Sequence, residues 1–119
     1  LKKLAASGVT LAIITGRNSP MVAKRAADLG IEHVIQGRED KGVALEALAE
    51  SLSIAAHETG YAGDDEPDVS ALLWARLSFA PANAHDCAKT AADHVTERRG
   101  GEGAVREICD AILALRSQA

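Results

Sequence analysis

The chain has 119 residues, of which 47% are hydrophobic, 25% charged and only 3% aromatic, a composition typical of one globular domain with a small-aliphatic core. A formal net charge of −4 argues against nucleic acid or an anionic membrane as a partner, because both require clustered basic residues. Two cysteines that form no CxxC pair argue against structural zinc or a disulfide framework. We therefore expect a single cytoplasmic domain over residues 1–119.

Predicted strands and helices alternate along the chain. A short helix ends at Gly8, and the apolar run over residues 9–14 predicts a buried strand. Asn18 or Ser19 then caps a helix that has Pro20 in its first turn. The same unit recurs, with further strands predicted over residues 31–36, 57–63, 76–81 and 93–98, each followed by a helix. This alternation predicts an α/β fold, a Rossmann-like parallel sheet with helices on both faces.

Three groups suited to phosphate chemistry follow the predicted strands. Thr15 and Asp64 come at the carboxyl ends of two strands, and Lys41 lies just after a third. Ligands of open parallel sheets bind at this edge. The turn GDDEPD over residues 63–68 crowds three acids together, and they repel one another unless a cation neutralises them. Oxygen ligands with no His or Cys among them favour Mg²⁺ over zinc.

Each of these features also has an ordinary explanation. A Thr-Gly pair after a strand is commonly a plain turn, and Lys41 alone would be a solvated lysine in a first helical turn. The acids could simply favour a helix start through the macrodipole, and Asp68, which follows Pro67, could cap that helix. The order of Thr, Lys and GDDxxD at successive strand ends is less easily explained by chance. It favours a site that binds a phosphate and Mg²⁺.

The segments IITGR, DKG and YAGDDEPD, in this order, resemble motifs II, III and IV of the haloacid dehalogenase (HAD) superfamily of phosphatases. Two longer stretches, ITGRNSPMVAKRAADLGIEHVIQGREDK and ADHVTERRGGEGAVREICDAIL, resemble the capless branch of this superfamily, which includes phosphatases of 3-deoxy-D-manno-octulosonate (KDO) 8-phosphate. The resemblance covers essentially the whole chain and implies a HAD-like domain.

The resemblance also implies roles for individual residues. Thr15 and Gly16 would bind the transferring phosphoryl group, and Lys41 would stabilise the nucleophile and its phospho-aspartyl intermediate. Arg17 would bind an anionic group of the substrate, for which a guanidinium is suited.

The acidic turn would hold the metal. By the same resemblance Asp64 is a direct Mg²⁺ ligand, while Asp65 and Asp68 orient the metal's waters and Lys41. The implied reaction is Mg²⁺-dependent hydrolysis of KDO 8-phosphate in lipopolysaccharide precursor biosynthesis, by a homotetramer whose tail lies near a neighbouring subunit's site.

Two alternatives stay open. One is a phosphatase of the same branch acting on a nine-carbon, sialic-type sugar acid phosphate. The other is a non-catalytic HAD-like assembly domain of a cytidylyltransferase, against which the intact TGR and GDDxxD motifs argue. A response-regulator receiver is set aside because its acidic pair precedes the Thr and Lys.

The chain departs from the family pattern at the nucleophile. Family members carry it in a DxDG motif on a first strand, whereas the earliest aspartate here is Asp28, inside a predicted helix. We expect that a first central strand, between the strands that begin near Val9 and Leu77, is lacking. The 119 residues alone are therefore expected to fold poorly and to be inactive, and the parent chain to be active.

Overall fold

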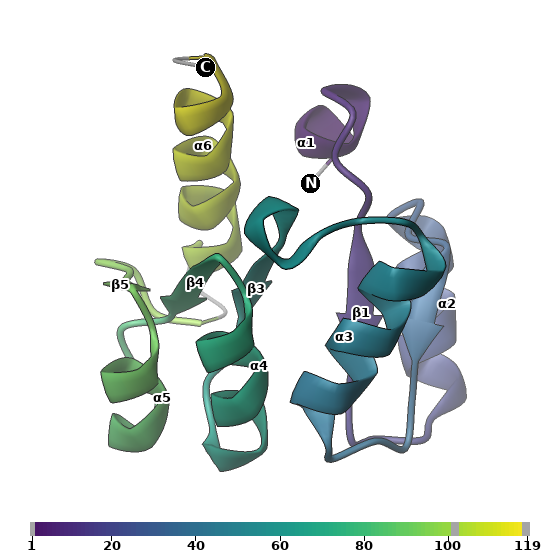
Figure 1. Cartoon of the computed structure of the whole chain (residues 1–119), viewed down its shortest axis with the longest axis horizontal. Coiled ribbons are helices and arrows are strands. Elements are labelled where there is room, and N and C mark those ends of the chain that lie inside the picture. Colours follow the sequence, from purple (N-terminus) through teal and green to yellow (C-terminus); the bar gives the residue numbers. More distant parts are fainter. Residues whose placement is uncertain (1, 101–102, 118–119) are drawn as a thin grey trace.

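The computed structural model describes residues 2–100 and 103–117, with side chains described for residues 3–100 and 103–115. Helices and strands alternate as predicted (Figure 1). The elements are α1 (Lys2–Ala6), β1 (Ala12–Ile14), α2 (Pro20–Asp28), β2 (His33–Ile35), α3 (Lys41–Ser51), β3 (Gly60–Ala62), α4 (Val69–Trp74), β4 (Leu77–Ala80), α5 (Asp86–Ala91), β5 (His94–Val95) and α6 (Ala104–Ser117), with short 3₁₀ turns at Ala56–Glu58 and Glu66–Asp68.

The strands are shorter than the apolar runs that predicted them. Residues 9–14 contribute only Ala12–Ile14, and residues 93–98 contribute only His94–Val95. A strand requires a hydrogen-bonded neighbour along its length, which an apolar run does not guarantee. The expectation of a buried strand over residues 9–14 was wrong, because every residue of β1 is exposed or half-buried. The prediction of element type and order was right, and the lengths were overestimated.

The described strands form two parallel sheets. One has the order β1-β2 and the other the order β3-β4-β5. The sheet edges therefore include β1 and β3, which face each other across the division between the two sheets in Figure 1. The expectation that a missing strand adjoins the strand at Leu77 was wrong, because β4 already has β3 and β5 as its two neighbours.

Local signals set the helix ends as expected. Ser19, rather than Asn18, caps α2: its hydroxyl accepts the Met21 N–H at 3.2 Å, and Pro20 is the first helical residue. Gly8 has a φ of 98°, a left-handed conformation that glycine adopts without strain, and this turns the chain from α1 toward β1.

The core consists mainly of alanine and leucine in two clusters. One joins Leu72 to buried alanines of β4 and α5, and the other joins Leu45 to Ala71 and Ala75, between α3 and α4. Trp74 packs against the second cluster and Phe79 is buried, so both are packing residues. The α3–α4 pair covers both sheets, because Ile14 of β1 and Tyr61 of β3 pack against the same cluster.

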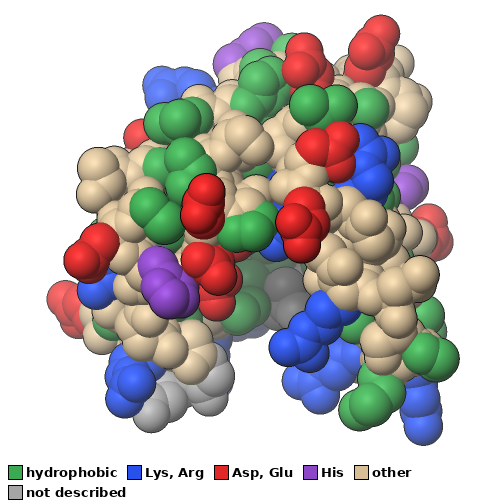
Figure 2. All heavy atoms as spheres, turned by 90° about the horizontal axis from the view of Figure 1, so that it is seen from below, with side chains coloured by type: hydrophobic (Ala, Val, Ile, Leu, Met, Phe, Trp, Pro, Cys, Tyr) green, Lys and Arg blue, Asp and Glu red, His purple; other side chains and the backbone are tan. Residues whose placement is uncertain are grey.

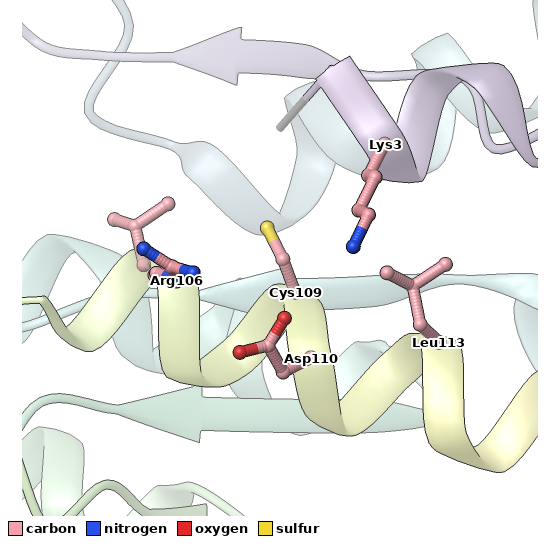
Figure 3. A pocket seen from close by; sticks show the side chains of 6 residues that line it. Lys3, Arg106, Cys109, Asp110 and Leu113 are labelled. Carbon is pink, nitrogen blue, oxygen red and sulfur yellow. The ribbon is translucent and has the colours of Figure 1, made fainter.

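Helix α6 packs against α1 at the far end of the molecule. Ile108 and Cys109 of α6 are buried. A pocket of about 550 Å³ lies between the two helices, where the Cys109 sulfur and the Lys3 ammonium point into the same space (Figure 3). This pocket contains none of the predicted site residues. In the part of the chain that the structure describes, no helix is long and apolar enough to cross a membrane.

Candidate active site

The turn after β1 positions the predicted phosphate donors. Thr15 extends the pairing with β2 by donating its N–H to the Ile35 carbonyl at 2.9 Å, and its hydroxyl accepts the Arg17 N–H at 3.1 Å. The N–H of Gly16 donates to none of the described residues. A hydroxyl and a free amide at a strand end are donors that a phosphate can use.

This turn is tied to the loop that leads into α3. The Thr15 carbonyl accepts the Arg38 N–H at 3.1 Å, and the Arg17 carbonyl accepts the Gly37 N–H at 2.9 Å. Arg38 also donates two hydrogen bonds to the carboxylate of Asp40, at 2.6 and 2.7 Å, and this contact lowers the pKa of Asp40. Asp40, the residue immediately before Lys41, is thereby linked to the Thr15 turn through Arg38.

Lys41 is the first residue of α3 and is directed at the acidic turn. Its ammonium donates to Asp68 Oδ1 at 2.9 Å, with 15% of the Lys41 side chain and 5% of the Asp68 side chain exposed. The reading of Lys41 as a solvated first-turn lysine is therefore wrong. The first turns of α3 and α4 lie close together, and the Gly42 N–H donates to Ser70 Oγ at 3.0 Å. This proximity permits the contact between Lys41 and Asp68.

The Asp68 carboxylate ties the acidic turn together. Oδ2 accepts the N–H groups of Asp64 and Asp65 at 3.0 and 3.3 Å, and Oδ1 accepts the Tyr61 hydroxyl at 2.6 Å as well as Lys41. The alternative capping role is confirmed for the 3₁₀ turn Glu66–Asp68, where Asp68 completes a capping box with Asp65, but the Asp68 side chain makes no capping bond to α4. Gly63 is required at its position, since a Cβ there would lie 2.4 Å from that of Asp68.

These contacts decide the charge states of the buried groups. Burial by itself would raise the pKa of Asp68, but hydrogen bonds from Tyr61, Lys41 and the Asp64 N–H outweigh it, so that the pKa falls below its ordinary value of 3.8. Burial, reinforced by the bond to Asp68, raises the pKa of the Tyr61 phenol well above its ordinary value. At neutral pH the site therefore holds an ionised Asp68 and a protonated Tyr61.

Asp64 and Asp65 lie at the exposed side of the turn. The Asp65 carboxylate accepts the Glu66 N–H at 2.7 Å and lies 3.9 Å from His85 Nε2, and among the described residues no hydrogen bond or ion pair joins it to Lys41. The expectation that Asp65 helps to orient Lys41 has no support in these contacts. The Asp64 carboxylate is exposed and receives no hydrogen bond from the described residues, while its main-chain carbonyl accepts the His85 N–H at 2.9 Å.

These carboxylates suit part of a Mg²⁺ shell. They are hard oxygen donors at a strand end, the chemistry that Mg²⁺ prefers. Over residues 2–100 and 103–117, no three His, Cys, Asp or Glu side chains are grouped closely enough to hold a metal by themselves. Asp64, with Asp65 beside it, would accordingly supply some of the ligands and other groups the remainder.

The predicted residues converge on one face of the molecule. Figure 2 looks onto the face toward which the strands' carboxyl ends point, where acidic side chains gather beside a hollow. Lys41 and Asp68 are in direct contact, and the Thr15 turn is bonded to the loop before Lys41. Among the described residues, no hydrogen bond or ion pair joins the Thr15 turn directly to the acidic turn, and the Arg17 side chain is exposed.

Sequence reasoning missed two residues of this face, Tyr61 and His85. A tyrosine in a predicted strand directly before an acidic turn was a usable signal, because a phenol removed from water needs a hydrogen-bond partner. The position of His85 beside Asp65 depends on α5 beginning next to the acidic turn, which no local pattern reveals.

Several proteins with similar sequences and structures are described as KDO 8-phosphate phosphatases. KDO 8-phosphate phosphatase of Escherichia coli (strain K12) is 45% identical over 107 residues, which cover 90% of this chain and 57% of that relative. The Moraxella catarrhalis KDO 8-phosphate phosphatase, crystallised with magnesium ion, phosphate ion and KDO, superposes with a TM-score of 0.91 at 45% identity and covers 93% of this chain and 64% of its own. The cobalt-bound Haemophilus influenzae enzyme has a TM-score of 0.91 at 39% identity, covering 95% and 66%.

The chain thus spans a little more than half the length of the curated relative. A family model described as haloacid dehalogenase-like hydrolase matches residues 33–108, which include Lys41 and the whole acidic turn. The expected HAD-like fold is confirmed by the structural superpositions. On the strength of that match, the chain belongs to the haloacid dehalogenase-like hydrolases.

Proposed function

We propose that this chain is the larger part of a Mg²⁺-dependent phosphatase that hydrolyses KDO 8-phosphate to KDO and phosphate. The observation that carries the proposal is the buried Lys41–Asp68 pair beside the exposed Asp64, at the carboxyl edge of the strands. The similarity to KDO 8-phosphate phosphatases supports the substrate. The nucleophilic aspartate would be supplied by a preceding segment that forms a strand between β1 and β3. "Complete protein" below means this chain with that segment.

The described residues would act mainly by binding the phosphoryl group. Thr15 and Gly16 offer a hydroxyl and an amide N–H to its oxygens, which gather charge as the ester bond breaks. An ammonium has three donors, and the Lys41 ammonium gives one to Asp68. The other donors remain for the phosphoryl group and for the nucleophilic carboxylate, whose acyl phosphate is later hydrolysed by water.

Asp64 would bind Mg²⁺ directly, and Asp65 would hold one of its waters. When bound, the ion neutralises phosphate charge and polarises the phosphoryl oxygens. Arg17, exposed on the Thr15 turn, would bind the carboxylate of the sugar acid. A nine-carbon sugar acid phosphate presents the same groups, so carbon number is left to experiment.

We further propose that the complete protein forms a homotetramer. Val105 and Leu115 of α6 are 54% and 49% exposed, whereas Ala104, Ile108 and Cys109 of the same helix are buried. In the tetramer a neighbouring subunit would cover these exposed apolar side chains. Light scattering coupled to size-exclusion chromatography measures the subunit number directly, and a monomer at micromolar concentration would contradict the proposal.

The function is tested by phosphate release from the complete protein, using eight- and nine-carbon sugar acid phosphates and a simple phosphomonoester. We expect the KDO ester to be preferred, and equal rates on all three would contradict sugar-acid specificity. Asp64→Asn should lower kcat by at least about 100-fold. It should also abolish the rise in Tm on adding Mg²⁺, which stabilises the folded state by about 2.7 kcal/mol at 100 times its Kd.

Asp28→Asn is the matched control, because Asp28 is an exposed carboxylate at the end of α2. It should retain both activity and the Mg²⁺ shift. Full activity and an unchanged shift in Asp64→Asn would instead remove Asp64 from the metal site.

A further inference from the structure

Tyr61 and Lys41 share one oxygen of Asp68. The Tyr61 hydroxyl donates to Oδ1 at 2.6 Å, and the Lys41 ammonium donates to the same atom at 2.9 Å. The other oxygen, Oδ2, is held by two main-chain N–H groups. The side chain of Asp68 is 5% exposed, so protein donors replace water around it.

The Tyr61 ring packs against both core clusters. One contains Leu72, Ala80, Ala84 and Ala88, and the other contains Leu45, Ala71 and Ala75. The ring therefore has a fixed place between α3, α4 and the sheet. Lys41, in contrast, is a long flexible chain that can follow its partner carboxylate.

We propose that Tyr61 is a positioning residue for phosphoryl transfer: its hydroxyl fixes the Asp68 carboxylate, and through it the direction of the Lys41 ammonium. This inference rests on the proposed function for the identity of the reaction. The main-chain bonds to Oδ2 locate one oxygen, while the phenol fixes the second and with it the plane of the carboxylate. Without the phenol, the carboxylate can rotate and carry the ammonium with it.

The test is Tyr61→Phe in the complete protein, which removes the hydroxyl but keeps the ring that packs in both clusters. We expect kcat to fall by about tenfold, since small misplacements of a group that stabilises the transition state have large effects on rate. KM should stay within about twofold, because the donors of the Thr15 turn are untouched. An unchanged kcat, or a fall in kcat no greater than that of the control below, overturns the inference.

Ser78→Ala is the control for the loss of a buried hydroxyl. Ser78 lies on the neighbouring strand β4, is fully buried, and its hydroxyl accepts the Asp93 N–H at 2.9 Å, far along the chain from the Lys41 contact. We expect this variant to lower Tm by at least as much as Tyr61→Phe and to leave kcat unchanged. A loss of rate confined to Tyr61→Phe then reflects positioning and not general destabilisation.

Crystal structures of the wild-type complete protein and Tyr61→Phe give a readout that does not depend on activity. In the variant we expect the Asp68 carboxylate to be rotated and the Lys41 ammonium to be displaced or spread over two positions. Unchanged Asp68 and Lys41 positions overturn the inference while leaving the proposed function intact. A wild-type protein that releases no phosphate from any of the three esters contradicts the proposed function alone, and the Lys41 position then still decides the role of Tyr61.

Discussion

At the scale of single residues, Asp68 determines how the site is assembled. Its two oxygens accept hydrogen bonds from the Tyr61 hydroxyl of β3, from two main-chain N–H groups of the acidic turn and from the ammonium of Lys41, the first residue of α3. One ammonium balances its charge. A buried ion pair of this kind contributes little compared with an apolar pair of the same shape, but removing one partner is costly because the other is left buried and uncompensated.

Asp68→Asn should therefore destabilise the complete protein at neutral pH, by about 3 kcal/mol. Because the pKa of Asp68 is lowered in the folded state, its ionised form stabilises the fold at pH values above the ordinary 3.8. That contribution disappears as the pH falls through the lower, folded-state pKa. Urea unfolding of both proteins should show a constant difference from pH 7 to 5 that shrinks below pH 4, and a difference that grows in acid would contradict this account.

At the scale of elements, the site depends on how closely α3 and α4 begin. The Gly42 N–H donates to Ser70 Oγ, and a Cβ on Gly42 would lie 2.6 Å from that oxygen and 2.9 Å from the Ser70 main-chain carbon. Lys41 directly precedes Gly42 and Asp68 lies two residues before Ser70, so the Lys41–Asp68 ion pair forms beside this close contact of the two helices. The lack of a side chain at Gly42 thus allows the ion pair to form.

Gly42→Ala should separate the two helix starts and cost about 1–3 kcal/mol of unfolding free energy, as overpacking does. Ser70→Gly should recover only part of this loss, because the main-chain carbon remains in the way. Gly60→Ala is the matched control, since its Cβ would meet only the Leu77 carbonyl, at 3.4 Å. Chemical denaturation compares the variants, and equal losses at Gly42 and Gly60 would show that the close approach is unimportant.

The elements also show what a sequence can predict. Ser19, Pro20 and Gly8 act on their own neighbours, so helix ends were predictable from local chemistry. The strand-end positions of Thr15, Lys41 and Asp64 followed from the alternation of strands and helices. The Tyr61–Asp68 bond and the Gly42–Ser70 approach were not predicted, because they depend on how strands and helices pack together in three dimensions.

At the scale of the whole molecule, the division into two parallel sheets is the main feature. Among the described residues, β1 pairs only with β2 and β3 only with β4, so each leaves a row of main-chain donors and acceptors without a strand partner. The expected neighbour at Leu77 was wrong because strand order is set by the folding topology and not by chain order. The α3–α4 pair bridges the two sheets through Ile14 and Tyr61.

The 119 residues expressed alone should therefore melt in a broad, weakly cooperative transition and release no phosphate. The complete protein should melt cooperatively, because a strand between β1 and β3 would join the two sheets into one. It should also release phosphate from its substrate. Calorimetry and a phosphate-release assay on the two proteins compare these outcomes. Cooperative melting together with Mg²⁺-dependent turnover by the 119 residues alone would refute both expectations.

The placement of the aromatic residues has an optical consequence. The 119 residues contain one tyrosine and one tryptophan, and Tyr61 and Trp74 pack against the same cluster of Leu45, Ala71 and Ala75. Tyrosine emission overlaps tryptophan absorption, so excitation energy passes from Tyr61 to Trp74 when this cluster is formed. The chain thus contains a built-in fluorescent reporter whose energy transfer follows the docking of α3 and α4 against β3.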